Sequence, residues 1–227
     1  MSAFWTPASQ ALTPYLHNRE QADKCLQIIA ASLQPGMSEQ DCELLIRDWL
    51  RAHQLFDPAR PPRVRFAGQP PRRRFGLNRP GKRRYRIGMS YILRCDAVQN
   101  GYVAKASLSG PASVLAPLHA QLCDIREQLP RTLQQGETPQ QLASHFPGLR
   151  QHYRLVPLTG TLPEGNRIYE APLIPGLWQW QPTLSDGQHS VASSEFLLMD
   201  DQGPRWLTAP PAHLLDNSHN DNQEEAA

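Results

Sequence analysis

Two segments of this chain, about a hundred residues apart, follow the same order of local signals. LQPGMSEQDCELL begins at Leu33, and LQQGETPQQLASH begins at Leu133. In each segment an apolar helical stretch stops at a glycine. A Ser or Thr N-cap follows, with Asp or Gln three residues after it, and a second helix begins at this cap. A repeat of this kind predicts two related halves, each built on a pair of helices.

The spacing of apolar residues predicts the remaining elements. Helices are expected over about 18–33, 38–53 and 112–133, with a short helix after Thr138. Strands are expected at 63–66, 90–96, 102–107, 166–171, 177–181 and 195–199, with a last short strand in DDQGPRWLT. Asn100-Gly101 is a tight-turn signal that joins the strands on either side as a hairpin. Paired helices with mostly antiparallel strands indicate an α+β protein.

One domain suits a chain of 227 residues, of which 40% are hydrophobic. We expect an N-terminal extension over 1–18, a single domain over 19–215 and a disordered acidic tail over 216–227. No signal peptide or membrane span is evident, so a cytoplasmic protein without membrane contact is expected. The four cysteines form no CxxC pair and indicate neither a zinc site nor a disulfide framework.

The formal net charge of +2 conceals a local concentration of positive charge. Residues 60–86 hold eleven Lys or Arg and no acid, which leaves the rest of the chain at −9. Arginine interleaved with Phe and Tyr suits phosphate contacts and stacking on nucleic acid. It also suits a solvated loop, or a loop that collects anions at a nearby pocket. Nucleic-acid binding through this loop is therefore an alternative function.

The order of four phrases resembles the creatinase and methionine/Xaa-Pro aminopeptidase family. These phrases are REQADKCLQIIAASLQPGMSEQDCELLI, GMSYILRCDAVQNGYVAKAS, LPEGNRIYEAP and SSEFLLMDDQGPRWLT, and they lie within about 19–208. The resemblance implies the pita-bread fold, a pseudo-symmetric α+β domain with a curved antiparallel sheet covered by helices. It also implies a pocket in which two Asp, one His and two Glu hold two divalent metals.

The positions that the resemblance assigns to these metal ligands carry other chemistry in this chain. The two Asp positions fall on Arg94 and Lys105, the two Glu positions fall on Ala171 and Ser194, and His152 is the nearest candidate for the histidine. Divalent metals bind where carboxylates supply negative charge, and a guanidinium beside an ammonium repels them. We therefore expect a metal-free protein without a cofactor, inactive as a metallopeptidase.

Three carboxylates lie close to the expected ligand positions in sequence. Asp96 is on the same strand face as Arg94 but displaced by roughly 6.6 Å along the strand. Glu170 and Glu195 are each one residue out of register, which turns their side chains to the opposite face unless a bulge intervenes. The cations Arg94 and Lys105 are thus expected either to pair with Asp96 or Glu170, or to hold an anionic ligand.

We expect a pseudoenzyme that binds a small anionic molecule, a peptide or a protein partner. Its candidate ligand-binding residues are Arg94, Lys105, Asp96, Phe75 and Arg74. Phe75 falls near the position at which the resembled enzymes carry a substrate-facing histidine.

A metal-independent enzyme acting on a small amino-acid-derived or peptide substrate is the alternative. Lys105, Glu170, His152 and Tyr102 are its candidate catalytic residues. A homodimer remains open, because members of the resembled family often form dimers.

Overall fold

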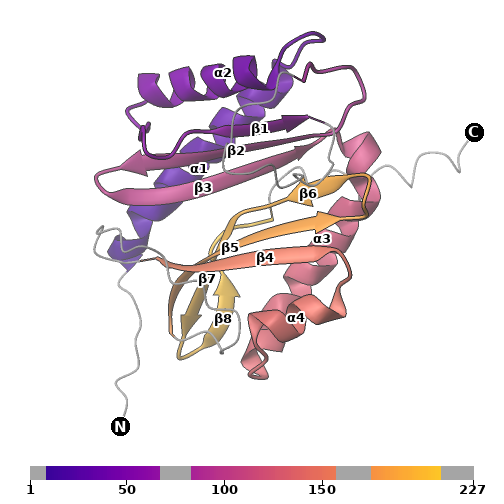
Figure 1. The fold of residues 1–227 in the computed structure, drawn as a ribbon. Helices are drawn as coiled ribbons and strands as arrows, with labels where there is room; N and C mark the ends of the chain where they lie inside the picture. The colour runs from indigo at the N-terminus through magenta and orange to yellow at the C-terminus, as the bar shows by residue number, and fades with distance from the viewer. Residues whose placement is uncertain (1–8, 67–82, 157–174, 211–227) are drawn as a thin grey trace, which may run out of the picture.

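The chain folds into two antiparallel sheets with helices packed against them (Figure 1). A computed structural model describes residues 9–66, 83–156 and 175–210. The elements are α1 (Ser9–Ala31), α2 (Glu39–Ala52), β1 (Arg63–Phe66), β2 (Tyr91–Gln99), β3 (Tyr102–Gly110), α3 (Ala112–Gln134), α4 (Pro139–His145), β4 (Leu149–Val156), β5 (Gly176–Ser185), β6 (Ser190–Ala192), β7 (Glu195–Asp200) and β8 (Gly203–Trp206). One sheet has the order β1-β2-β3, and the other has the order β4-β5-β7-β8 with β6 paired to β5. No helix within the described ranges is long and apolar enough to span a bilayer.

The two halves repeat one another, as the sequence predicts. α1 and α3 are both 23 residues long, and each leads into a shorter helix through a glycine with positive φ, Gly36 at 93° and Gly136 at 83°. Ser38 and Thr138 then form capping boxes with the residues three positions later. Each box satisfies backbone N–H groups that the first helical turn leaves without partners. This local chemistry fixes the bend between the two helices of each pair.

The hairpin of β2 and β3 forms around the predicted turn. Asn100 and Gly101 have φ values of 52° and 81°, the pair of positive angles that a type I′ hairpin turn requires. The resulting register places Arg94 opposite Ser107 and Asp96 opposite Lys105. β1 adds to the other edge of β2 with Arg63 opposite Arg94. Arg63, Arg94, Asp96 and Lys105 take their positions from these pairings.

The structure corrects the sequence-based elements at three places. α1 begins at Ser9 rather than near Asn18, because Leu12 and Tyr15 are buried and extend its apolar face. β4 runs through the segment around His152, where no strand was expected. The short strand β6 was also missed. The strand expected over 166–171 lies outside the described residues.

A separate apolar core forms in each half, and a third cluster joins them. In the joining cluster, Tyr15 of α1 meets Phe196 of β7 with ring centroids 5.9 Å apart. A polar link lies beside it, where the hydroxyl of Ser109 on β3 accepts a hydrogen bond from the backbone N–H of Ala192 on β6. These contacts hold the two sheets in a fixed relation, so that a site can form between them.

A buried ion pair attaches α3 to the second sheet. The carboxylate of Glu195 on β7, which is fully buried, accepts a hydrogen bond from Arg126 Nε at 2.5 Å. Arg126 also donates to the backbone carbonyl of Thr208 and stacks 4.8 Å from the ring centroid of Trp206. Burial raises the pKa of Glu195, and the Arg126 charge opposes that rise.

Replacing Glu195 with Ala should lower the free energy of unfolding by about 3–5 kcal/mol, because the change leaves the Arg126 guanidinium buried and unpaired. Urea denaturation measures this loss. The paired change Arg126→Met with Glu195→Leu should recover part of it, since an apolar pair of similar volume carries no desolvation cost. A loss below about 1 kcal/mol for Glu195→Ala would contradict the role of the pair in attaching α3.

Candidate functional site

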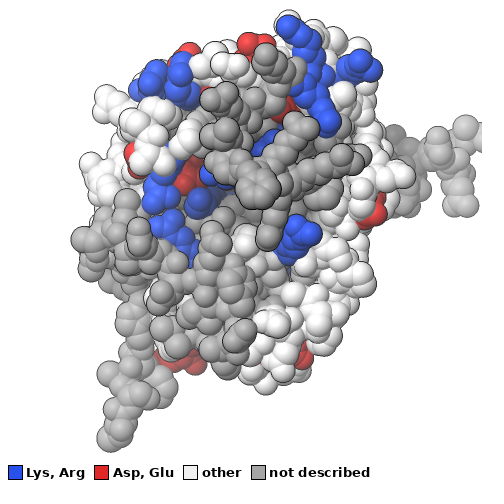
Figure 2. Space-filling model, viewed as in Figure 1, with Lys and Arg blue, Asp and Glu red and all other residues white. Residues whose placement is uncertain are grey.

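A polar cavity of about 400 Å³ lies where strands of both sheets approach one another. Its walls come from the segment before β1 and from β1 to β5, with Ser193 at one side. Four of the lining residues are cationic and one is acidic: Arg60, Arg63, Arg94 and Lys105, with Asp96. Figure 2 shows Lys and Arg side chains gathered around a carboxylate on this face. The cavity is therefore strongly electropositive.

Asp96 neutralises part of this charge. Its Oδ2 lies 3.2 Å from Lys105 Nζ and 3.2 Å from Arg60 Nη1. Arg60 also contacts Asp57, with 3.5 Å between Nε and Oδ2. Of the two alternatives left open for Lys105, pairing with a carboxylate or holding an anionic ligand, the structure shows a pair with Asp96, and it adds Arg60 as a second cation on the same carboxylate oxygen.

Arg94 has a different environment from Lys105. Its Nη2 donates to the hydroxyl of Thr183 on β5 at 2.9 Å, so the side chain reaches across from the first sheet to the second. Its buried Nε has no hydrogen-bond partner within the described part of the chain. Burial lowers the pKa of Arg94, and the neighbouring charges of Arg63 and Arg65 lower it further.

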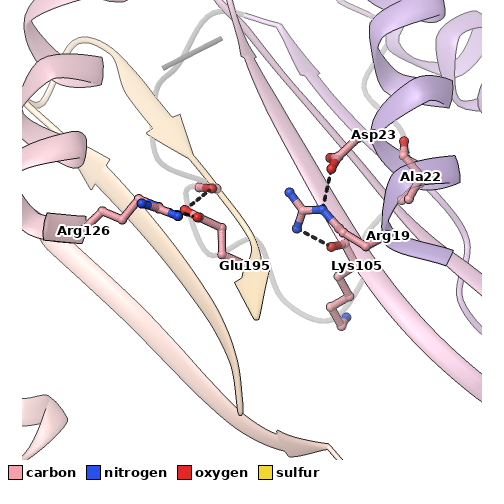
Figure 3. A network of polar contacts seen from close by, with 8 residues as sticks. Arg19, Ala22, Asp23, Lys105, Arg126 and Glu195 are labelled. Carbon is pink, nitrogen blue, oxygen red and sulfur yellow. Dashed lines mark hydrogen bonds and ion pairs between the residues drawn. The ribbon is translucent and has the colours of Figure 1, made fainter. Parts of the chain in front are cut away.

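Helix α1 positions the strand that carries Lys105 (Figure 3). The buried guanidinium of Arg19 donates from Nη1 to the backbone carbonyl of Lys105 at 2.9 Å. Arg19 Nε lies 2.6 Å from Asp23 on the next helical turn. Asn18 adds a second tie to β3 by donating to the carbonyl of Tyr102. Burial raises the pKa of Asp23 against the opposing effect of the Arg19 charge.

His152 and Tyr102, two predicted catalytic candidates, lie in different places. His152 is an exposed residue of β4 and lines the cavity. Tyr102 packs edge-on against Tyr15, with ring centroids 5.1 Å apart, beside the cluster that joins the halves. Tyr102 is not among the cavity-lining residues. The structure thus places His152 with Arg94 and Lys105 in the cavity lining, whereas the half-buried Tyr102 packs against the joining cluster.

The donor set of the cavity does not fit a pair of divalent metals. Arg94 and Lys105 occupy the positions that the resemblance assigns to Asp ligands, and neither cation can donate an electron pair to a metal. Ser194, which immediately precedes β7, is fully buried. The carboxylate of the next residue, Glu195, is paired with Arg126. Within the described ranges no group of three or more His, Cys, Asp or Glu could hold a metal ion.

Sequence reasoning missed three residues of the site, namely Arg60, Arg63 and Thr183. Arg60 and Arg63 lie within the basic stretch, but only the register of β1 on β2 brings Arg63 to Arg94. Thr183 belongs to the other sheet and becomes a partner through tertiary packing. The remaining predicted site residues, Phe75, Arg74, Glu170 and Ala171, lie outside the described residues.

Comparisons with known proteins identify the fold. No family model matches the chain, and no curated protein matches it. An X-Pro aminopeptidase from Thermotoga maritima MSB8 has a similar structure, with a TM-score of 0.70 at 15% sequence identity over 90% of this chain and 63% of that chain. A dipeptidase from Pyrococcus horikoshii OT3 gives 0.68 at 20% identity, over 89% of this chain and 61% of that one.

A third similar structure is the N-terminal domain of the FACT complex subunit SPT16 from Eremothecium gossypii. Its TM-score is 0.58 at 13% identity, over 94% of this chain and 61% of that chain. This chain thus spans less than two thirds of the length of each of the three structures. The sequence identities are too low to assign the activity of these proteins to this chain. The structural similarity establishes that the chain has the pita-bread fold of the Xaa-Pro aminopeptidases and prolidases.

Proposed function

We propose that this chain is a metal-free pita-bread domain, inactive as a metallopeptidase, whose cavity binds a small anionic ligand. One observation carries the proposal. Arg94 and Lys105, at the two positions where the resembled enzymes hold metals with Asp, line a cavity together with two further arginines. The cations thus supply the positive charge that metal ions supply in the resembled enzymes, and the natural occupant of such a cavity is an anion.

Electrostatics favours an anion over a metal by a wide margin. Two unit charges 4 Å apart interact by about 4 kcal/mol at an effective dielectric constant near 20, so each cation beside the cavity adds a penalty of that order for a divalent metal. Among the described residues that line the cavity, Asp96 is the single carboxylate, and it already contacts Lys105 and Arg60. The same terms with opposite sign attract a carboxylate or a phosphate.

The lining also restricts the size and polarity of the ligand. A cavity of about 400 Å³ is at the small end of ligand sites. Its walls carry hydroxyl and amide groups from Ser107, Thr183, Ser193 and Gln181 beside the cations, and the apolar contributions come from Ala, Pro and Cys. This composition suits a compact polar molecule better than a bulky apolar side chain.

Divalent metals should not stabilise the protein. Thermal unfolding measured with Mn²⁺, Co²⁺ or Zn²⁺ at millimolar concentration should give the same midpoint as with Mg²⁺ or with a chelator, because the described lining offers such ions a single carboxylate, Asp96, which is already paired with two cations. Metal analysis after loading and dialysis provides an independent check. Two tightly held metals per chain, with a raised unfolding midpoint, would restore the metallohydrolase interpretation.

Inorganic phosphate should raise the unfolding midpoint, since a ligand that binds only the folded state stabilises it by RT ln(1 + [L]/Kd). The shift should disappear in Arg94→Gln when each variant is compared with its own phosphate-free baseline. Arg131→Gln provides the matched control, because Arg131 is an exposed arginine on α3 outside the cavity. A shift of equal size in the wild type, Arg94→Gln and Arg131→Gln would show a general salt effect and would contradict the proposal.

A further inference from the structure

We infer that the cavity contains two unlike subsites: an open anion site between Arg63 and Arg94, and a site at Lys105 and Arg60 that is already occupied by the carboxylate of Asp96. Asp96 is then an internal counter-anion that weakens the binding of external anions. The inference rests on the proposed function and deepens it, because it names the residues that meet the ligand and the charge that the ligand carries.

The open subsite follows from the register of β1 on β2. Arg63 and Arg94 are direct cross-strand partners in an antiparallel pair, which puts their Cβ atoms roughly 4.5–5.5 Å apart on one face of the sheet. Like charges in this arrangement destabilise a sheet unless something neutralises them. No carboxylate in the described part of the chain forms a salt bridge with Arg63 or Arg94, and Glu43 interacts with Arg63 only at longer range. Both residues line the cavity, so an anion can supply the missing charge there.

Arg94 also has an unused hydrogen-bond donor at this point. Thr183 accepts from Nη2, whereas the buried Nε lacks a partner among the described residues. A buried donor without an acceptor destabilises a protein. An oxyanion beside Arg94 would therefore offset the repulsion between the Arg63 and Arg94 charges and would also accept a hydrogen bond from the unsatisfied Nε.

The occupied subsite follows from the register of β2 on β3. Asp96 and Lys105 are direct cross-strand partners of opposite charge, and Arg60 contacts the same Oδ2 as Lys105. The three side chains are only 15%, 27% and 23% exposed for Asp96, Lys105 and Arg60, so water screens their attraction weakly. A ligand that uses Lys105 or Arg60 must compete with this carboxylate.

The charge of the open subsite indicates the class of ligand. Two guanidinium groups that form no salt bridge among the described residues are best balanced by one group of charge −2, since a single carboxylate supplies only half of that charge. The ligand is therefore a small polar dianion, of which a phosphoryl group is the compact form. Free phosphate and a phosphate ester share this chemistry. They differ in the organic group that an ester carries on its phosphoryl group.

The decisive variant is Asp96→Asn, because it removes the internal counter-anion with almost no change of shape. Isothermal titration calorimetry at fixed pH and ionic strength measures the Kd of inorganic phosphate, glycerol 3-phosphate and acetate for the wild type, Asp96→Asn, Arg94→Gln and Lys105→Gln. We expect phosphate to bind at least about tenfold more tightly than acetate, and Asp96→Asn to strengthen phosphate binding by at least about tenfold.

The two cation variants test the same inference without relying on Asp96→Asn to fold. Arg94→Gln should weaken phosphate binding by at least about tenfold and by clearly more than Lys105→Gln, because Arg94 contacts the anion directly whereas Lys105 acts on it only through its charge. Equal losses in the two variants would overturn the division into subsites. Tighter binding of glycerol 3-phosphate than of phosphate would identify an esterified ligand, and the reverse order would identify the free ion.

The outcomes separate this inference from the proposed function. Phosphate binding that is lost in Arg94→Gln but unchanged or weakened in Asp96→Asn would keep the anion site and overturn the role of Asp96 as an internal counter-anion. Equal affinities for acetate and phosphate would overturn the dianion. Absence of anion binding in both the wild type and Asp96→Asn would overturn the proposed function together with the inference.

Discussion

The cross-strand pairing of β1, β2 and β3 determines the character of the cavity. One register sets Arg63 against Arg94, two charges of the same sign, and Asp96 against Lys105, two charges of opposite sign. A shift by one residue would turn all of these side chains to the other face of the sheet. The Asn100-Gly101 turn fixes the register of β2 on β3, and so it sets Asp96 against Lys105.

The second half of the fold completes the site from the other side. α1 holds β3 through Arg19 and the Lys105 carbonyl, and α3 holds β7 through Arg126 and Glu195 (Figure 3). The apolar cluster between Tyr15 and Phe196 joins these two assemblies, and Arg94 then reaches Thr183 on the opposite sheet. A buried carboxylate that lies next to an expected metal position thus serves to attach a helix.

Signals from neighbouring residues predicted much of the local structure: the capping residues Ser38 and Thr138 and the Asn100-Gly101 turn were confirmed. Apolar periodicity was less complete, because it placed the start of α1 too late and missed β4 and β6. The pita-bread fold followed from the resemblance of longer phrases. The cavity was only half predictable. Arg94, Lys105 and Asp96 follow from the resemblance and from strand spacing, but Arg63, Arg60 and Thr183 join them through pairings between distant segments, for which a single sequence carries no signal.

An experimental structure of the protein in the presence of phosphate tests the central claim most directly. The account predicts an anion between the guanidinium groups of Arg63 and Arg94, near the Thr183 hydroxyl, with Asp96 still paired to Lys105 and Arg60. A metal ion coordinated by Asp96, or an Arg94 side chain neutralised by a carboxylate of the protein with no anion beside it, would contradict the account.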